Sequence, residues 1–108
     1  HVNQVDVGLR DKYRNLAKSV PALIMSNGLM QTLAFLKGKG SDRNRNEHGE
    51  LLRHVLEWLV EANVTPKKEF ESVMEWCSAK ETTTIEYQRA TEETQAILRW
   101  IRQLADTV

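Results

Sequence analysis

Apolar positions recur with a helical period along most of the chain. One stripe, with spacings of four, three and four residues, is formed by Leu9, Tyr13, Leu16 and Val20. These spacings predict a first helix. We expect it to end near Pro21, because a proline disfavours the helical conformation in the residue before it. Since proline suits the first turn of a helix, a second, short helix is expected from Pro21 to Ile24.

An Asn27-Gly28 dipeptide interrupts the apolar stretch that follows. Asn-Gly is a turn signal, and glycine adopts the left-handed conformation that often ends a helix. The sequence therefore predicts a break at this point and a new helix over residues 29–36. Residues 37–45 are polar and basic, so we expect them to form a loop.

Three further segments carry helical signals, and strand-type alternation of useful length is absent from the sequence. A 3.6-residue repeat predicts a helix over 47–62, ended by Asn63. Thr65 and Pro66 read as the N-cap and first residue of the next helix. A regular three-and-four spacing predicts a long final helix over 87–108. The expected fold is an all-α bundle of about five or six helices, in which the long C-terminal helix packs across the others.

Composition supports one globular domain spanning residues 1–108. The chain is 41% hydrophobic and 28% charged, with only 5 Gly and 2 Pro, which suits a helical domain that buries a core. The one cysteine, Cys77, excludes an internal disulfide framework, so we expect a cytoplasmic location. Because no apolar run of 18 residues occurs, no membrane association is expected.

Positive and negative charges are unevenly distributed although the formal net charge is zero. Residues 1–45 contain eight Lys or Arg against three acids and carry +5, whereas the remainder carries −5. Arg10, Arg14 and Lys18 follow one another at i+4 and should form a ridge on the first helix. Such a split predicts that a basic part faces an anionic partner while an acidic part faces something else.

Candidate catalytic groups do not form a recognisable set. His48 and His54 are six residues apart, on different sides of a helix, and lack the HExxH spacing of zinc proteases, so we interpret both as surface histidines. Cys77 falls at core spacing, which indicates a packed thiol. Trp58, Trp76 and Trp100 lie on or beside apolar stripes and are expected in core or subunit contacts. We therefore expect no enzymatic activity, metal, cofactor or small-molecule substrate.

Three blocks of the sequence resemble one known family. They are YRNLAKSVPALIMSNGLMQTLAFLKGKG (13–40), LLRHVLEWL (51–59) and YQRATEETQAILRWIRQLA (87–105). The most specific positions are Pro21, Ile24, Asn27, Gly28, Leu29, Leu33, Ala34, Phe35, Arg89, Ala90, Thr91, Glu93 and Trp100. Together the blocks resemble the small subunit of the type III-B CRISPR effector, the Cmr ribonucleoprotein complex.

The resemblance implies a small, all-α, non-catalytic subunit that lines up along a filament of backbone subunits. With the large subunit it would help to hold guide RNA and target RNA, so its partners would be these subunits, further copies of itself and the RNA. The expected RNA-binding residues are Arg10, Arg14, Lys18, Lys37, Lys39, Arg43 and Arg45. The expected protein-interface residues, which would meet a basic neighbour, are Glu57, Glu61, Glu69, Glu71 and Glu75.

A second hypothesis remains open at this stage. The charge split can serve head-to-tail stacking of identical copies, the basic part of one against the acidic part of the next, without RNA contact. Exposed portions of Leu51, Leu56 and Trp58 are a further candidate surface for pairing two copies.

Overall fold

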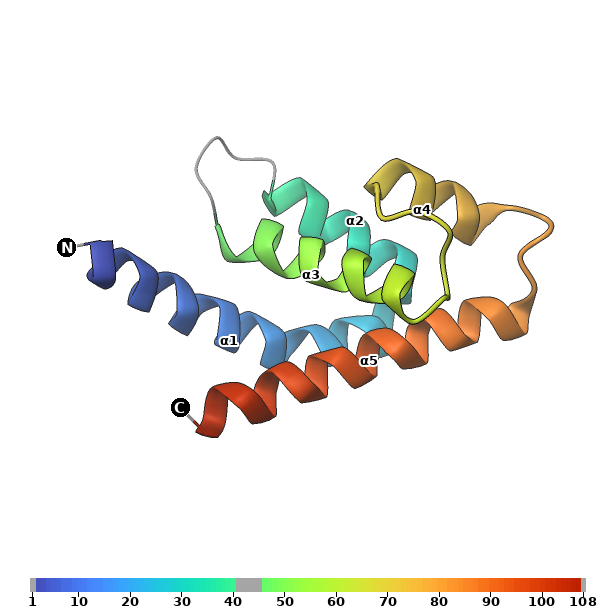
Figure 1. Cartoon of the computed structure of the whole chain (residues 1–108). Helices are drawn as coiled ribbons and strands as arrows, with labels where there is room; N and C mark the ends of the chain where they lie inside the picture. Colours follow the sequence, from blue (N-terminus) through green and yellow to red (C-terminus); the bar gives the residue numbers. More distant parts are fainter. Residues whose placement is uncertain (1, 41–45, 108) are drawn as a thin grey trace.

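The long first and last helices form an antiparallel pair with both chain ends at the same end of the molecule (Figure 1). The computed structural model describes the backbone of residues 2–40 and 46–107 and the side chains of 8–40 and 46–104. The regular structure of these residues consists of α1 (Val2–Asn27), α2 (Leu29–Gly40), α3 (Glu47–Glu61), α4 (Phe70–Ser78) and α5 (Thr84–Thr107). A hairpin of α2 and α3 packs on the pair, and α4 lies against α2. The predicted all-α fold with a long C-terminal helix is confirmed.

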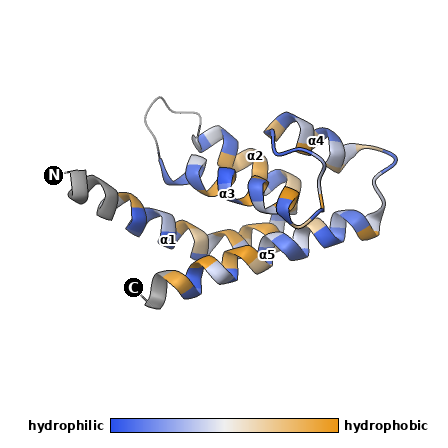
Figure 2. Ribbon diagram, in the orientation of Figure 1, coloured by the Kyte–Doolittle hydropathy of each residue, from blue (hydrophilic) through white to orange (hydrophobic). Residues whose placement is uncertain are grey.

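The core lies where the hairpin meets the antiparallel pair. It consists of Ala17, Val20, Ile24, Leu29, Leu33, Leu36, Leu51, Leu52, Val55, Leu56, Leu59, Val73, Ala90 and Leu98. In Figure 2, hydrophobic residues follow the part of α1 that lies beside α5 and recur along the C-terminal half of α5. Leu51 and Leu56 are 0% and 5% exposed. The predicted pairing surface at these leucines is therefore wrong, because both are already buried within the chain.

Helix α1 continues through Pro21, so the predicted helix end at this residue is wrong. A proline inside a helix removes one backbone hydrogen bond and costs roughly 3 kcal/mol. Val20 and Ile24 lie on either side of it and are almost fully buried. Their burial contributes about 1.5–3 kcal/mol each, which offsets the cost of the proline. In Figure 1, α1 bends in its second half instead of dividing into two helices.

The predicted break at Asn27-Gly28 is confirmed. Gly28 has a φ of +87°, in the left-handed region, and separates α1 from α2. The hydroxyl of Tyr87 on α5 accepts a hydrogen bond of 3.1 Å from the backbone N–H of Met30. This contact satisfies one of the unpaired N–H groups at the start of α2 and joins the break to α5.

The C-terminal end of α2 and the start of α3 approach each other through two glycines. A Cβ on Gly40 would lie 2.7 Å from the Cα of Gly49. Asn46 fixes both ends here, because its Oδ1 accepts from the N–H of Gly49 and its Nδ2 donates to the carbonyl of Lys39. Lys37 and Lys39 therefore lie in the last turn of α2, and the expectation of a loop beginning at residue 37 is wrong.

Two helix starts differ from the expectation. Thr65 does not cap α4, which begins at Phe70, because the N–H of Thr65 donates to the carbonyl of Leu59 and helps to end α3. A cap that the sequence analysis missed begins α5. The N–H of Thr83 donates to the Glu86 carboxylate while the N–H of Glu86 donates to the Thr83 hydroxyl, a reciprocal capping box.

Candidate nucleic-acid interface

Two stripes of basic residues start from one contact between α1 and α5. The side-chain amide of Gln95 donates to the backbone carbonyl of Pro21 at 3.4 Å, so these positions face each other. On α1, the residues three, seven and eleven positions before Pro21 are Lys18, Arg14 and Arg10. On α5, the residues four and seven positions after Gln95 are Arg99 and Arg102. Since these spacings keep residues on one side of a helix, both stripes run along the same flank of the pair.

The antiparallel direction of the helices brings the two stripes to the same end of the molecule (Figure 1). At a rise of 1.5 Å per residue, Arg14 and Arg102 both lie about 10 Å from the Gln95–Pro21 contact along the helix axes. Lys18 and Arg99 lie about 5–6 Å from it. We call these five residues the basic flank: Arg10, Arg14, Lys18, Arg99 and Arg102.

In the sequence, acids stand just beyond the two basic stripes, Asp11 before residue 12 and Asp106 after residue 105. Neither residues 12–27 of α1 nor residues 94–105 of α5 include Asp or Glu. Asp11 lies 3.7 Å from the Arg14 guanidinium, a long and exposed ion pair of little energetic weight. The Nε of Arg14 is buried and lacks a hydrogen-bond partner among the described residues. Between residues 12 and 27 of α1 and between residues 94 and 105 of α5, the flank thus carries positive charge with no acid in the same segment.

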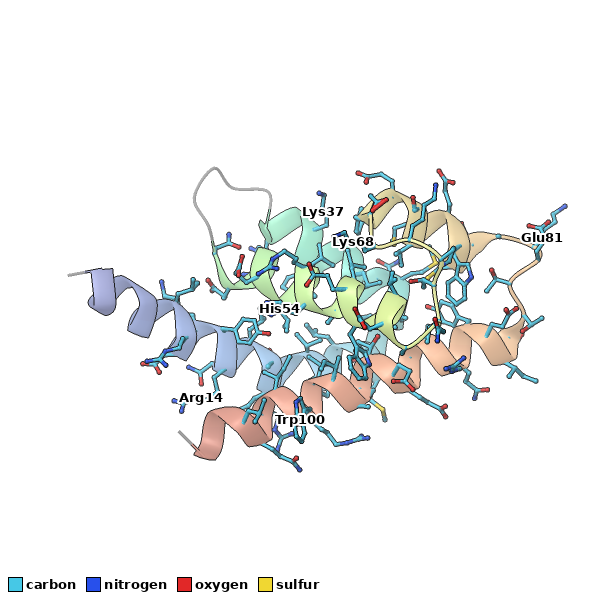
Figure 3. The ribbon with its side chains drawn as sticks, viewed as in Figure 1. Arg14, Lys37, His54, Lys68, Glu81 and Trp100 are labelled. Atoms are coloured by element: carbon cyan, nitrogen blue, oxygen red, sulfur yellow. The ribbon has the colours of Figure 1, made fainter. Side chains whose placement is uncertain are left out.

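The other predicted RNA-binding residues lie elsewhere. Figure 3 places Arg14 at the lower edge of the molecule and Lys37 at the upper edge, near α4. The Lys37 ammonium lies 5.5 Å from the centre of the Phe70 ring. Lys39 is exposed and lies two residues after Lys37 on α2. The predicted sites Arg43 and Arg45 lie outside the described residues. The structure thus divides the predicted set into two separate basic surfaces.

Sequence reasoning missed several basic residues. Arg99 and Arg102 join the α1 ridge only because α5 runs back beside α1. Lys68 lies near Lys37 in Figure 3, and both line a cleft of about 380 Å³ that also includes Arg53. To predict that Arg99 and Arg102 join the α1 ridge, one has to know that the first and last helices are neighbours. The helical period of the sequence does not show which helices are neighbours.

The predicted acidic interface is also divided. Glu57, Glu61 and Glu69 line an open groove of about 830 Å³ between α3, α5, the middle of α1 and the segment before α4. Glu71 and Glu75 lie on α4 and do not line it. Three of the five predicted residues are therefore gathered at one concave surface.

His54 belongs to a hydrogen-bonded network that joins α3 to α1. The Arg53 guanidinium is 3.2 Å from its Nε2, and because arginine only donates, Nε2 accepts and Nδ1–H donates to the Tyr13 oxygen at 2.6 Å. Burial raises the pKa of Tyr13 to about 12. His48 packs edge-on against Phe35, and both histidines are half-buried, so they are less exposed than expected. Across the described residues, no group of three or more His, Cys, Asp or Glu could hold a metal ion.

The cysteine and the tryptophans differ in their burial. Cys77 is half-buried against the core, and burial raises the pKa of its thiol to about 11, in accord with a packed, unreactive group. Trp76 also packs against the core. Trp58 and Trp100 remain 36% and 56% exposed. Within the part of the chain that the structure describes, no helix is both long and apolar enough to cross a membrane.

Residues of the third sequence block act as connections between helices. The Arg89 guanidinium donates to the carbonyl of Ala62 at the C-terminal end of α3. The Trp58 indole N–H donates to the Glu93 carboxylate at 3.1 Å. These contacts hold α5 to α3, so Arg89 and Glu93 have a structural role that the sequence did not reveal.

Fold and surface together define a class, that of small all-helical proteins with separate basic and acidic residues on their surface. The family model of the CRISPR-associated protein (Cas_Cmr5) matches residues 1–108. The chain therefore belongs to this family of small subunits of the type III-B Cmr complex.

Two relatives carry the name CRISPR system Cmr subunit Cmr5. The protein of Thermus thermophilus is 26% identical over 99 residues, which cover 92% of this chain and 76% of the relative. The protein of Thermotoga maritima is 35% identical over 54 residues, which cover 50% of this chain and 42% of the relative. No solved structure gave a significant match.

Proposed function

We propose that this protein is a non-catalytic small subunit that packs along the filament of a type III-B Cmr complex and contacts guide or target RNA. It would act in the cytoplasm, in RNA-guided antiviral defence. The observation that carries the RNA contact is the basic flank, where two helices distant in sequence place five cations on one side. Family membership supports the assignment to the complex.

Phosphate recognition requires cations at several points and little else. Arginine and lysine side chains neutralise phosphates, and the release of counterions makes such binding depend steeply on salt. Five cations correspond to a salt slope of about −3.5 on a single strand, from roughly −0.7 per phosphate. One copy would bind RNA weakly, and repeated copies along a filament would bind it strongly through multivalency.

A second candidate function is head-to-tail stacking of copies without RNA contact. It is favoured by the position of the basic flank and of the groove lined by Glu57, Glu61 and Glu69, which lie on different sides of α1. Arg14 belongs to the flank, whereas its neighbour Tyr13, about 100° away around the helix, lines the groove. Opposite charges on separate surfaces of one molecule suit a heterologous contact between copies.

Titration with a fluorescent single-stranded RNA of about 40 nucleotides at several salt concentrations tests the proposal. The variants are Arg99→Glu/Arg102→Glu on the basic flank and Lys37→Glu/Lys39→Glu at the end of α2. Because the double reversal on the flank removes two of five cations, the salt slope should fall by at least about 1.4 units. A smaller loss in the α2 variant would identify the flank as the main contact.

Glu81→Lys serves as the matched control for a change of charge, since Glu81 is exposed at the end of the molecule remote from Arg14 (Figure 3). RNA affinity that is equal in the wild type and the Arg99→Glu/Arg102→Glu variant would contradict the RNA contact. If the same variant then lost self-association measured by sedimentation, head-to-tail stacking would be the better account.

A further inference from the structure

The groove between α3 and α5 has an apolar floor. Its lining includes Tyr13 from α1, Trp58 from α3, and Ile97 and Ile101 from α5. Pro66, from the segment between α3 and α4, closes one side. At about 830 Å³ it exceeds the Lys37 cleft of about 380 Å³. The groove is therefore larger than the Lys37 cleft, and its floor resembles the core of a protein interface.

An exposed apolar stripe on α5 extends this floor. Trp100 is three residues after Ile97, and Leu104 is seven residues after it, so all three share one side of the helix. Trp100 is 56% exposed and Leu104 is 48% exposed. Single exposed apolar residues are common, but a continuous row beside an apolar groove marks an interaction surface.

Carboxylates line the groove on the α3 side and on the segment before α4. Glu57 and Glu61 lie one turn apart on α3. Glu93 on α5 accepts the hydrogen bond from the Trp58 indole and so joins the two walls. The basic lining residues, Lys67 and Lys68, lie on the segment before α4, at the border of the groove. A partner that lies along α3 therefore meets the negative charge of Glu57 and Glu61 beside the apolar side chains of α5.

We propose that this groove binds an amphipathic helix of another protein subunit, with apolar residues on the floor and Lys or Arg against Glu57 and Glu61. The assignment rests on the proposed function, since the partner is sought within the Cmr complex. An RNA strand suits the groove less well, because the glutamates repel phosphates.

Backbone chemistry favours a helix over an extended peptide. Three walls of the groove are helices, whose N–H and C=O groups are already paired within each helix. An extended peptide gains affinity by pairing its backbone with the edge of a sheet. Because these walls present no such edge, the partner has to satisfy its own backbone hydrogen bonds, as a helix does.

Photo-crosslinking in the reconstituted complex tests the site directly. We would replace Trp100 with p-benzoylphenylalanine, irradiate the complex with RNA bound, and identify the linked peptide by mass spectrometry. The expected product is a link to a Lys- or Arg-bearing helical segment of a different protein subunit. Replacing Ile85, which is 77% exposed near the start of α5, provides the matched control and should not link to this segment.

Charge reversal at Glu61 provides the second measurement. Glu61 is exposed in the last turn of α3, where a lysine is favourable to the helix dipole, so Glu61→Lys should fold normally. We expect it to weaken incorporation into the complex about tenfold, whereas Glu81→Lys leaves it unchanged.

The outcomes separate this proposal from the RNA contact. Crosslinks from position 100 only to RNA, only to a second copy of this chain, or to nothing would refute the docked helix, as would normal incorporation of Glu61→Lys. The RNA titration of the isolated protein tests Arg99 and Arg102, and its result does not depend on the groove. A failure of the groove proposal therefore leaves the RNA result standing, and the reverse is also true.

Discussion

Gly28→Ala tests the fold most directly. The backbone conformation of Gly28 disfavours the added methyl group, whereas the space around it would accept one. Its φ of +87° is unfavourable to any residue with a Cβ, at a cost of about 1–2 kcal/mol. The space is open, since a Cβ would lie 3.9 Å from the nearest atom, the Tyr87 hydroxyl. Strain and not a clash should therefore decide the result. Allowing for the smaller entropy of an unfolded alanine, we expect Gly28→Ala to destabilise the protein by about 1 kcal/mol.

Gly38 supplies the matched control. It lies inside α2, and a Cβ there would have nothing within 4 Å. Gly38→Ala should stabilise by about 0.5–1 kcal/mol, because alanine is the better helix former. In a domain of this size, about 1 kcal/mol shifts the melting temperature by roughly 4–8 °C. Thermal unfolding followed by circular dichroism should thus move in opposite directions for the two variants. A Gly28→Ala melting temperature equal to or above that of the wild type would refute the left-handed break.

Three further predictions concern other residues. Because burial raises the Cys77 thiol pKa to about 11 from 9.0, its alkylation by iodoacetamide at pH 8 should be about ten to a hundred times slower in the folded protein than in urea; equal rates would contradict the packed thiol. The pKa of Tyr13 is raised to about 12 from 10.0, so the unfolded state loses this proton first and stability falls as the pH rises from 10 towards 12. Allowing for its partial exposure, we expect a loss of about 1 kcal/mol at pH 11 in urea titrations, which Tyr13→Phe should abolish. Arg89→Ala removes the hydrogen bond to the Ala62 carbonyl and should cost about 1 kcal/mol in urea unfolding; a free energy of unfolding equal to that of the wild type would contradict a structural role of this contact.

Local sequence signals predicted the helix ends correctly where a single residue type sets the backbone conformation. Gly28 ended a helix as expected, and Asn63, with a φ of 59°, lies just beyond the end of α3. Pro21 misled the analysis, because the burial of Val20 and Ile24 outweighs the cost of a proline within the helix. Long-range packing decided this case, and it is not contained in any short stretch of sequence.

The candidate site was predicted less well because it depends on which helices are neighbours. Periodicity identified Arg10, Arg14 and Lys18 as a ridge, and the structure places them on one side of α1 as expected. The periodicity of the sequence could not show that Arg99 belongs to the basic flank or that Lys37 lies apart from it. Whether these residues touch RNA stays a prediction.

The charge separation along the sequence is not the charge separation of the molecule. By sequence, Arg99 and Arg102 belong to the part that carries −5, yet the return of α5 beside α1 adds them to the basic flank. The same helix turns Ile97 and Ile101 towards the groove. Since Ile97 and Arg99 are two residues apart, they lie about 200° apart around the axis, so α5 serves both surfaces with opposite sides. Its position is set by contacts elsewhere, above all by Arg89 against the end of α3 and by Tyr87 against the start of α2. Loss of those contacts should therefore weaken RNA and protein binding together, whereas changes at Arg99 or Ile97 should affect one surface alone.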